Sequence, residues 1–246
     1  MKTVVLSVIA LFLSLALLVS GSAMLGTLIA LRLDMEGVAE AALGIVMAAY
    51  SLGFIIGATY AVDVIRKVGH IRAFAVFAAI ACATTLMHPL IVSAETWALM
   101  RVVVGFCLAG LMTVTESWIN DRATNESRGK LLGIYTINFY LASAAGQLLV
   151  GLGNPMEYVV FSVVAMLIVL SMVPLALTQS LIPTSPSHTE TLGVRKLIRQ
   201  APAGMTGVLA SGIALGAFLS LAPVYALRVG LDISQLSLYM GFSVIC

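Results

Sequence analysis

The sequence predicts an all-α integral membrane protein with seven full membrane spans and a partial eighth. Its 246 residues are 61% hydrophobic and 10% charged, and the mean hydropathy is +1.08, whereas soluble domains carry about 25% charged residues. Most of the charge lies between apolar stretches that have at least the roughly 20 residues an α-helix needs to cross a bilayer. The stretches without a charged residue are 3–31, 41–62, 73–94, 131–156, 158–189 and 201–227.

The remaining elements follow in order along the chain. The first stretch continues without a charge to Leu31, which is too long for the apolar core of an ordinary signal peptide. An uncleaved first span is therefore favoured over cleavage at Ala23. A fourth span is expected at 96–119, where two charged residues interrupt the apolar pattern. The last segment, 233–246, is apolar but has only fourteen residues, about two thirds of a span.

A polar segment containing Pro, Ser and Thr divides the chain. We expect a six-helix N-terminal bundle at 1–178, a cytoplasmic linker at 179–202 and the start of a second bundle at 203–246. A weak repeat supports two related halves, because "ALRL" closes the first span, "ALRV" closes the seventh, and a glycine follows each. Since a half-span cannot satisfy its backbone across a bilayer, we expect the 246 residues to be a partial sequence or a truncated reading frame.

Lysine and arginine gather in alternate loops. Ten of the 13 lie in one set of loops, and only Arg32 and Arg228 lie in the opposite set. Basic loops of membrane proteins stay on the cytoplasmic side, so the N-terminus is predicted to be cytoplasmic in a multi-pass protein of the cell (inner) membrane. The ten residues are Lys2, Arg66, Lys67, Arg72, Arg122, Arg128, Lys130, Arg195, Lys196 and Arg199.

Three polar side chains within the predicted spans are candidates for a solute pathway or cavity. Arg101 costs about 2.5–3.5 kcal/mol in hydrocarbon unless it faces a cavity or a partner, although its position also allows it to snorkel to the outer interface. Asn138 and Gln147 lie half a turn out of phase, so at least one is expected to bond a neighbouring helix while the other faces a cavity. His88 is expected at the outer membrane interface.

Small residues recur every four positions in the second predicted span, among them Gly53 and Gly57. Such spacing forms a groove in which a second helix packs closely. Gly105 thins the fourth span one turn below Arg101. Tight packing and a sliding gate need the same groove, so both interpretations stay open.

The densest charge lies in "TESWINDRATNESRGK", residues 115–130, in the cytoplasmic turn between the fourth and fifth spans. We expect it to pair with the loop "RKVGHIR", residues 66–72, as a charge latch that holds the inner side closed in the outward-open state. The alternative is a solvated loop whose bases only fix the topology. The residues of the predicted latch are Asp63, Arg66, Lys67, Gly69, Arg72, Glu116, Asp121 and Arg128.

With these motifs the chain resembles a transporter of the major facilitator superfamily (MFS). "RKVGHIR" resembles the family's motif between spans two and three, "RVVVG" at 101–105 resembles its fourth-span arginine motif, and "ESWINDRATNESRGKLLG" resembles the stretch that follows. These sequence stretches are similar to those of the bacterial YcaD-like subgroup. The resemblance implies alternating access, in which two six-helix bundles rock around a central solute site.

Departures from the family pattern limit what the resemblance implies. Arg66 stands where the motif usually has an aspartate, Gln147 follows Gly146 where antiporters often have proline, and the first span has no acid. Coupling to a proton or another ion is therefore left open.

We expect a secondary active transporter (permease) that moves a small solute. The alternatives are a truncated non-functional fragment of such a transporter and, less favoured, a seven-helix receptor. An enzyme is not expected, because HExxH, GxSxG and paired intramembrane carboxylates are missing from the sequence. The expected partners are the solute and the lipid bilayer, without nucleic acid, cofactor or metal.

Overall fold

A computed structural model describes residues 2–123, 126–177 and 198–245, with side chains from residue 9 onward except those of 121 and 122. All of the regular structure in these ranges is helical. The elements are α1 Lys2–Met35, α2 Glu40–Val68, α3 His70–Met87, η1 His88–Leu90, α4 Ala94–Arg122, α5 Arg128–Leu149, η2 Val150–Leu152, α6 Tyr158–Leu170, α7 Met172–Ala176, α9 Pro202–Arg228 and α10 Ile233–Ile245.

Six helical segments in the described ranges are long and apolar enough to cross a membrane. The fifth predicted span, α5, has 22 residues, but polar residues such as Asn138 and Gln147 lower its hydropathy and it is not among the six. The predicted count of seven full spans and a partial eighth therefore stays a prediction, with the shorter α10 as its last segment. The six segments are Ile9–Met35, Glu40–Val68, His70–Leu90, Ala94–Asn120, Tyr158–Ala176 and Pro202–Arg228.

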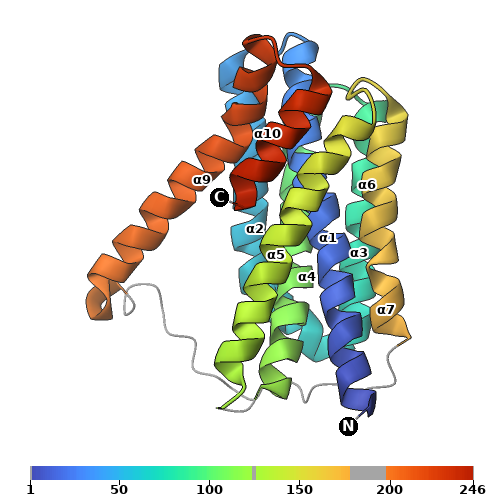
Figure 1. Cartoon of the computed structure of the whole chain (residues 1–246), viewed down its shortest axis with the longest axis vertical. Coiled ribbons are helices and arrows are strands. Elements are labelled where there is room, and N and C mark those ends of the chain that lie inside the picture. Colours follow the sequence, from blue (N-terminus) through green and yellow to red (C-terminus); the bar gives the residue numbers. More distant parts are fainter. Residues whose placement is uncertain (1, 124–125, 178–197, 246) are drawn as a thin grey trace.

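The helices α1 to α7 form an elongated bundle around α1 (Figure 1). Helix α1 packs on α5, α6, α7 and α9, while α4 packs on α2 and α3. Leu15, Leu18, Leu25 and Leu28 of α1 are fully buried as a result. We call the end with the loops 36–39, 91–93, 153–157 and 229–232 the outer end, following the predicted topology, and the opposite end the inner end.

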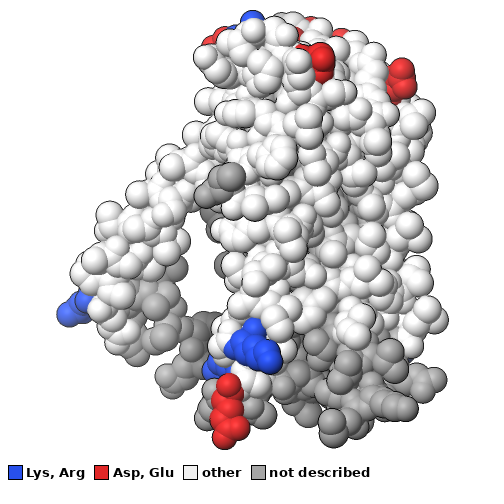
Figure 2. Space-filling model, viewed as in Figure 1, with Lys and Arg blue, Asp and Glu red and all other residues white. Residues whose placement is uncertain are grey.

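The exposed charge of the described residues gathers at the two ends of the molecule. On the face shown in Figure 2, acidic side chains gather at the outer end, and the flank between the ends is white over its described part. Between its ends the described bundle exposes large apolar side chains, such as Ile45, Leu52 and Ile137. An uncharged apolar belt of this kind is what a surface in contact with lipid requires.

Helices α9 and α10 meet the bundle at its outer end only. The last turns of α9 are buried at Ala222, Val224 and Ala226, whereas the residues from 202 to 217 are exposed apart from the half-buried Met205. Figure 1 shows α9 slanting away from the bundle towards the inner end. The predicted linker at 179–202 lies mostly outside the described residues, so its boundaries stay a prediction.

The first and seventh predicted spans end in the same way. At the end of α1, the N–H groups of Gly37 and Val38 donate to the carbonyls of Asp34 and Leu33, and at the end of α9 those of Gly230 and Leu231 donate to Leu227 and Ala226. These are the two hydrogen bonds of a Schellman motif, which places a left-handed residue after the helix. Gly37 and Gly230 have φ angles of 72° and 93°, which glycine adopts without a steric penalty.

Candidate transport pathway and charged contacts

The guanidinium of Arg101 is enclosed between α2 and α4. The side chain is 5% exposed, and its central carbon lies 4.4 Å from the centroid of the Tyr50 ring, a cation–π distance. Its Nε–H has no hydrogen-bond acceptor among the described residues. Buried polar atoms usually have a partner, and the Nε atom of Arg101 is one of four buried side-chain atoms among the described residues that lack one.

Three glycines bring Tyr50 and Arg101 together. A Cβ atom at Gly53 would lie 2.0 Å from the carbonyl oxygen of Val102, and one at Gly105 would lie 2.1 Å from that of Tyr50. Gly57 is equally close, because a Cβ there would lie 2.4 Å from the carbonyl oxygen of Phe106. The helix-packing glycines predicted from the sequence thus lie in one contact, that of α2 with α4.

His88 lies in an aromatic cluster at the outer end. It is fully buried, its ring stacks on Phe161 and meets Trp97 edge-on, and its Nδ1 lies 2.9 Å from the carbonyl oxygen of Thr84. A carbonyl can only accept, so Nδ1 is the donor. Trp97 lies one turn from Arg101 on α4 and donates to the carbonyls of His88 and Ile91, which fixes the loop above the arginine.

Asn138 and Gln147 both hydrogen-bond helix α1. The Asn138 amide donates to the carbonyl of Phe12 over 3.2 Å, while Gln147 accepts from the Thr27 hydroxyl over 2.7 Å and donates to the carbonyl of Ala23. Gln147 is 3% exposed, and the Oδ1 atom of Asn138 is buried without a partner among the described residues. In this structure both residues join α5 to α1.

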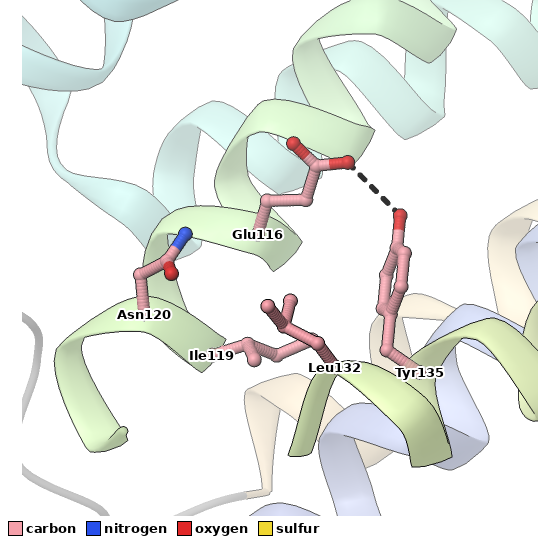
Figure 3. Close-up of a pocket in the computed structure, with 5 residues that line it drawn as sticks. All are labelled: Glu116, Ile119, Asn120, Leu132 and Tyr135. Carbon is pink, nitrogen blue, oxygen red and sulfur yellow. Dashed lines mark hydrogen bonds between the residues drawn. The ribbon is translucent and has the colours of Figure 1, made fainter. Parts of the chain in front are cut away.

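At the inner end, Glu116 bonds to a tyrosine. The hydroxyl of Tyr135 on α5 donates to the Glu116 carboxylate on α4 over 3.0 Å. The two side chains line a cavity of about 260 Å³ together with Ile119, Asn120 and Leu132 (Figure 3). The sequence interpretation expected a cytoplasmic base as the partner of Glu116; the described partner is a neutral donor.

The predicted latch residues lie at the inner end. The ion pair that the structure describes among them lies within a single helix. Arg66 pairs with Asp63 within α2 over 3.5 Å. The described link between the two loops is a hydrogen-bond contact of 2.7 Å between His70 Nε2 and Ser117 Oγ. Gly69, with φ at 85°, makes the sharp turn from α2 to α3.

Among the latch side chains that the structure describes, no ion pair joins the two loops. The ion pairs found among the described residues do not involve Lys67, Arg72 or Arg128. The side chain of Asp121 lies outside the described residues.

The two arginines of the outer end make the contacts that sequence reasoning missed. Arg32 pairs with Glu36 over 2.8 Å and donates to the backbone carbonyls of Pro155 and Met156. Arg228, from the second half of the chain, pairs with Asp34 over 2.7 Å and with Glu40. The sequence shows two arginines and six acidic residues in the predicted outer loops. These counts do not determine which arginine pairs with which acidic residue.

The apolar helices and the charge at their ends define a multi-pass membrane protein. The chain belongs to the major facilitator superfamily, whose family model matches residues 6–246. The family prediction made from the three sequence motifs is thereby confirmed.

Known relatives and solved structures agree with this assignment. The MFS-type transporter YcaD of Escherichia coli is 29% identical over 242 residues, which are 98% of this chain and 63% of the relative. This chain therefore spans 63% of the length of the curated relatives it matches. The similarity to YcaD also confirms the predicted subgroup.

Solved transporters share the fold. A bacterial homologue of the lysosomal transporter Spinster, inward-facing and unoccupied, has a TM-score of 0.75 at 19% identity and covers 97% of this chain and 59% of its own. A variant of the nucleoside transporter NupG has a TM-score of 0.77 at 15% identity, covering 98% and 65%. A D-xylose–proton symporter has a TM-score of 0.64 at 17% identity, covering 97% and 65%.

Proposed function

We propose that this chain is part of a secondary active permease that carries a small solute across the cell membrane by alternating access. The observation that carries the proposal is the uneven packing of α9. This helix contacts the six-helix bundle through its outer turns and stands apart from it towards the inner end (Figure 1). Contact of α9 and α10 with the first bundle at one end, with α9 parted from it at the other, corresponds to one of the two states that alternating access requires.

Arg101 is the proposed solute-binding residue of the first half. It combines a permanent charge, near-complete burial and an Nε–H without a partner among the described residues. Asn138 adds a buried carbonyl oxygen that likewise lacks a partner in the described part of the chain, while Gln147 supports α5 through its bonds to α1. A transporter needs such groups along its pathway, because a polar solute must exchange its water shell for protein partners there.

The orientation and the coupling belong to the same proposal. We place the N-terminus in the cytoplasm of an inner-membrane protein, because the basic loops lie at the inner end and the acids of Figure 2 gather at the outer end. A coupling proton or ion is included, with Glu116 and Tyr135, which line the inner-end cavity, as its proposed carriers. The fold shared with a D-xylose–proton symporter supports this addition.

Solute uptake into proteoliposomes tests the proposal. The native chain is reconstituted and offered radiolabelled sugars, nucleosides, amino acids and organic anions. For a solute that is taken up, Arg101→Ala should lower the rate by roughly tenfold or more, the effect of about 1.4 kcal/mol of lost binding.

The control variant is Arg199→Ala, which removes an exposed arginine outside the bundle and should leave the rate unchanged. Unchanged uptake by a folded Arg101→Ala variant would reduce Arg101 to a packing residue. Absence of uptake of every solute by the native chain would favour the alternative of a non-functional fragment.

A further inference from the structure

We propose that Arg228, Asp34 and Glu40 form an outer clasp that, with the contact of α10 on α5, is the gate that must open for the solute to reach the pathway from outside. The inference rests on the proposed transport function. It adds the identity of the residues that hold the described state closed on its outer side.

The clasp joins segments about 190 positions apart. Arg228 lies in the last turn of α9, and its Nη2 and Nε atoms lie 2.7 Å and 3.1 Å from Oδ1 of Asp34 at the end of α1. Its Nη1 atom bonds Glu40, the first residue of α2. One arginine therefore holds two helices of the first half, and two carboxylates that would repel each other share its charge.

The local structure leaves Arg228 free for this role. The nearest acid along the chain, Asp232, accepts the N–H of Gln235 over 2.8 Å, and the Gln235 side chain accepts the N–H of Asp232. This reciprocal pair caps the N-terminus of α10. Asp232 is thus committed to its own helix, and the described ion pairs of Arg228 cross to the other half.

Small residues close the surface beside the clasp. A Cβ atom at Gly151 in η2 would lie 2.6 Å from Oγ and 3.3 Å from Cβ of Ser237 on α10. One turn further along α10, a Cβ atom at Gly241 would lie 2.9 Å from the Leu148 side chain. Ser237 is 4% exposed. We call this contact the Gly151–Ser237 seam; with the clasp, it closes the outer end.

The clasp and the seam hold together the parts that alternating access must separate. Towards the inner end α9 is exposed and stands apart from the bundle, so the described contacts between the halves lie at the outer end. Exposed ion pairs change an equilibrium by up to roughly fivefold, which is enough to bias two states of similar free energy without locking either.

Cysteine labelling measures the opening of the seam independently of transport. Ser237→Cys is introduced into the native chain with its own cysteines replaced by serine, and a membrane-impermeant maleimide is added from outside. Arg228→Glu should increase the labelling rate severalfold, and the double variant Arg228→Glu with Asp34→Arg should return it towards the starting rate. Arg199→Glu, at an exposed arginine outside the bundle, should leave it unchanged.

A disulfide across the seam provides the second measurement. The distance of 3.3 Å between the Cβ positions of residues 151 and 237 is within a few tenths of an ångström of the roughly 3.5–4.5 Å of disulfides. Oxidised Gly151→Cys with Ser237→Cys should stop uptake, and reduction should restore it.

The gate proposal is wrong if the Arg228→Glu variant is labelled at the starting rate and the oxidised double-cysteine protein still takes up solute. Rapid disulfide formation in a chain that takes up no solute would support the outer contact while rejecting the transport proposal. The failures of the two proposals are therefore distinguishable.

Discussion

A single methyl group at Gly53 should disrupt the tightest helix contact of the bundle. The Cβ atom of an alanine there would lie 2.0 Å from the carbonyl oxygen of Val102, and real Cβ contacts essentially never come below 3.0 Å. Helices α2 and α4 would have to separate by about 1 Å, the difference between these two distances. Overpacking of this kind costs about 1–3 kcal/mol.

The matched control is Gly44→Ala in the same helix, where a Cβ atom meets nothing within 4 Å. Thermal unfolding in detergent, followed by circular dichroism, provides the comparison. At about 2–4 °C per kcal/mol for a chain of this size, Gly53→Ala should lower Tm by about 2–12 °C. Gly44→Ala should leave Tm unchanged or raise it, since alanine is favoured over glycine in helices by up to about 1 kcal/mol. Equal Tm values for the two variants would refute the argument that α2 and α4 are in backbone contact.

Two further predictions concern the ends of α4. Trp97→Phe should lower the free energy of unfolding by about 1–3 kcal/mol, because two carbonyl groups lose their donor. The control Trp118→Phe, at a tryptophan whose ring contacts that of His70, should lower it less. Equal losses for the two variants, measured by circular dichroism, would contradict the role of the Trp97 indole N–H. Glu116→Gln keeps an acceptor for Tyr135 but removes the charge of the proposed latch. It should favour the described state and so raise the rate of cysteine labelling from the inner side by up to about fivefold. A labelling rate equal to that of the Glu126→Gln variant would instead favour a solvated loop.

The membrane class and the family could be predicted from the sequence because they depend on one-dimensional patterns. Charge confined to short segments between apolar stretches indicates a membrane protein whatever the packing. The four-residue spacing of Gly53 and Gly57 likewise indicates a helix-packing groove, because residues at this spacing lie on one face of a helix.

The partners of polar residues could not be predicted in the same way. Asn138 and Gln147 lie half a turn out of phase, yet both bond α1, because side-chain reach and helix crossing decide the contact. Glu116 bonds Tyr135, which is 19 positions away, although bases were nearer in the charge pattern. The ion pair of Arg228 with Asp34 depends on how α9 docks, which no local pattern contains.

The glycine contact of α2 with α4 also has a mechanical consequence. From this backbone contact we infer that α2 and α4 move together as one rigid beam. Each has 29 residues, a length of about 43 Å at 1.5 Å per residue. Glu40 lies at the outer end of this beam and Glu116 near its inner end. A tilt produced when the arginine at the outer end lets go of Glu40 would therefore reach the carboxylate at the cytoplasmic mouth as a displacement of the same rigid body, without any change in the intervening packing.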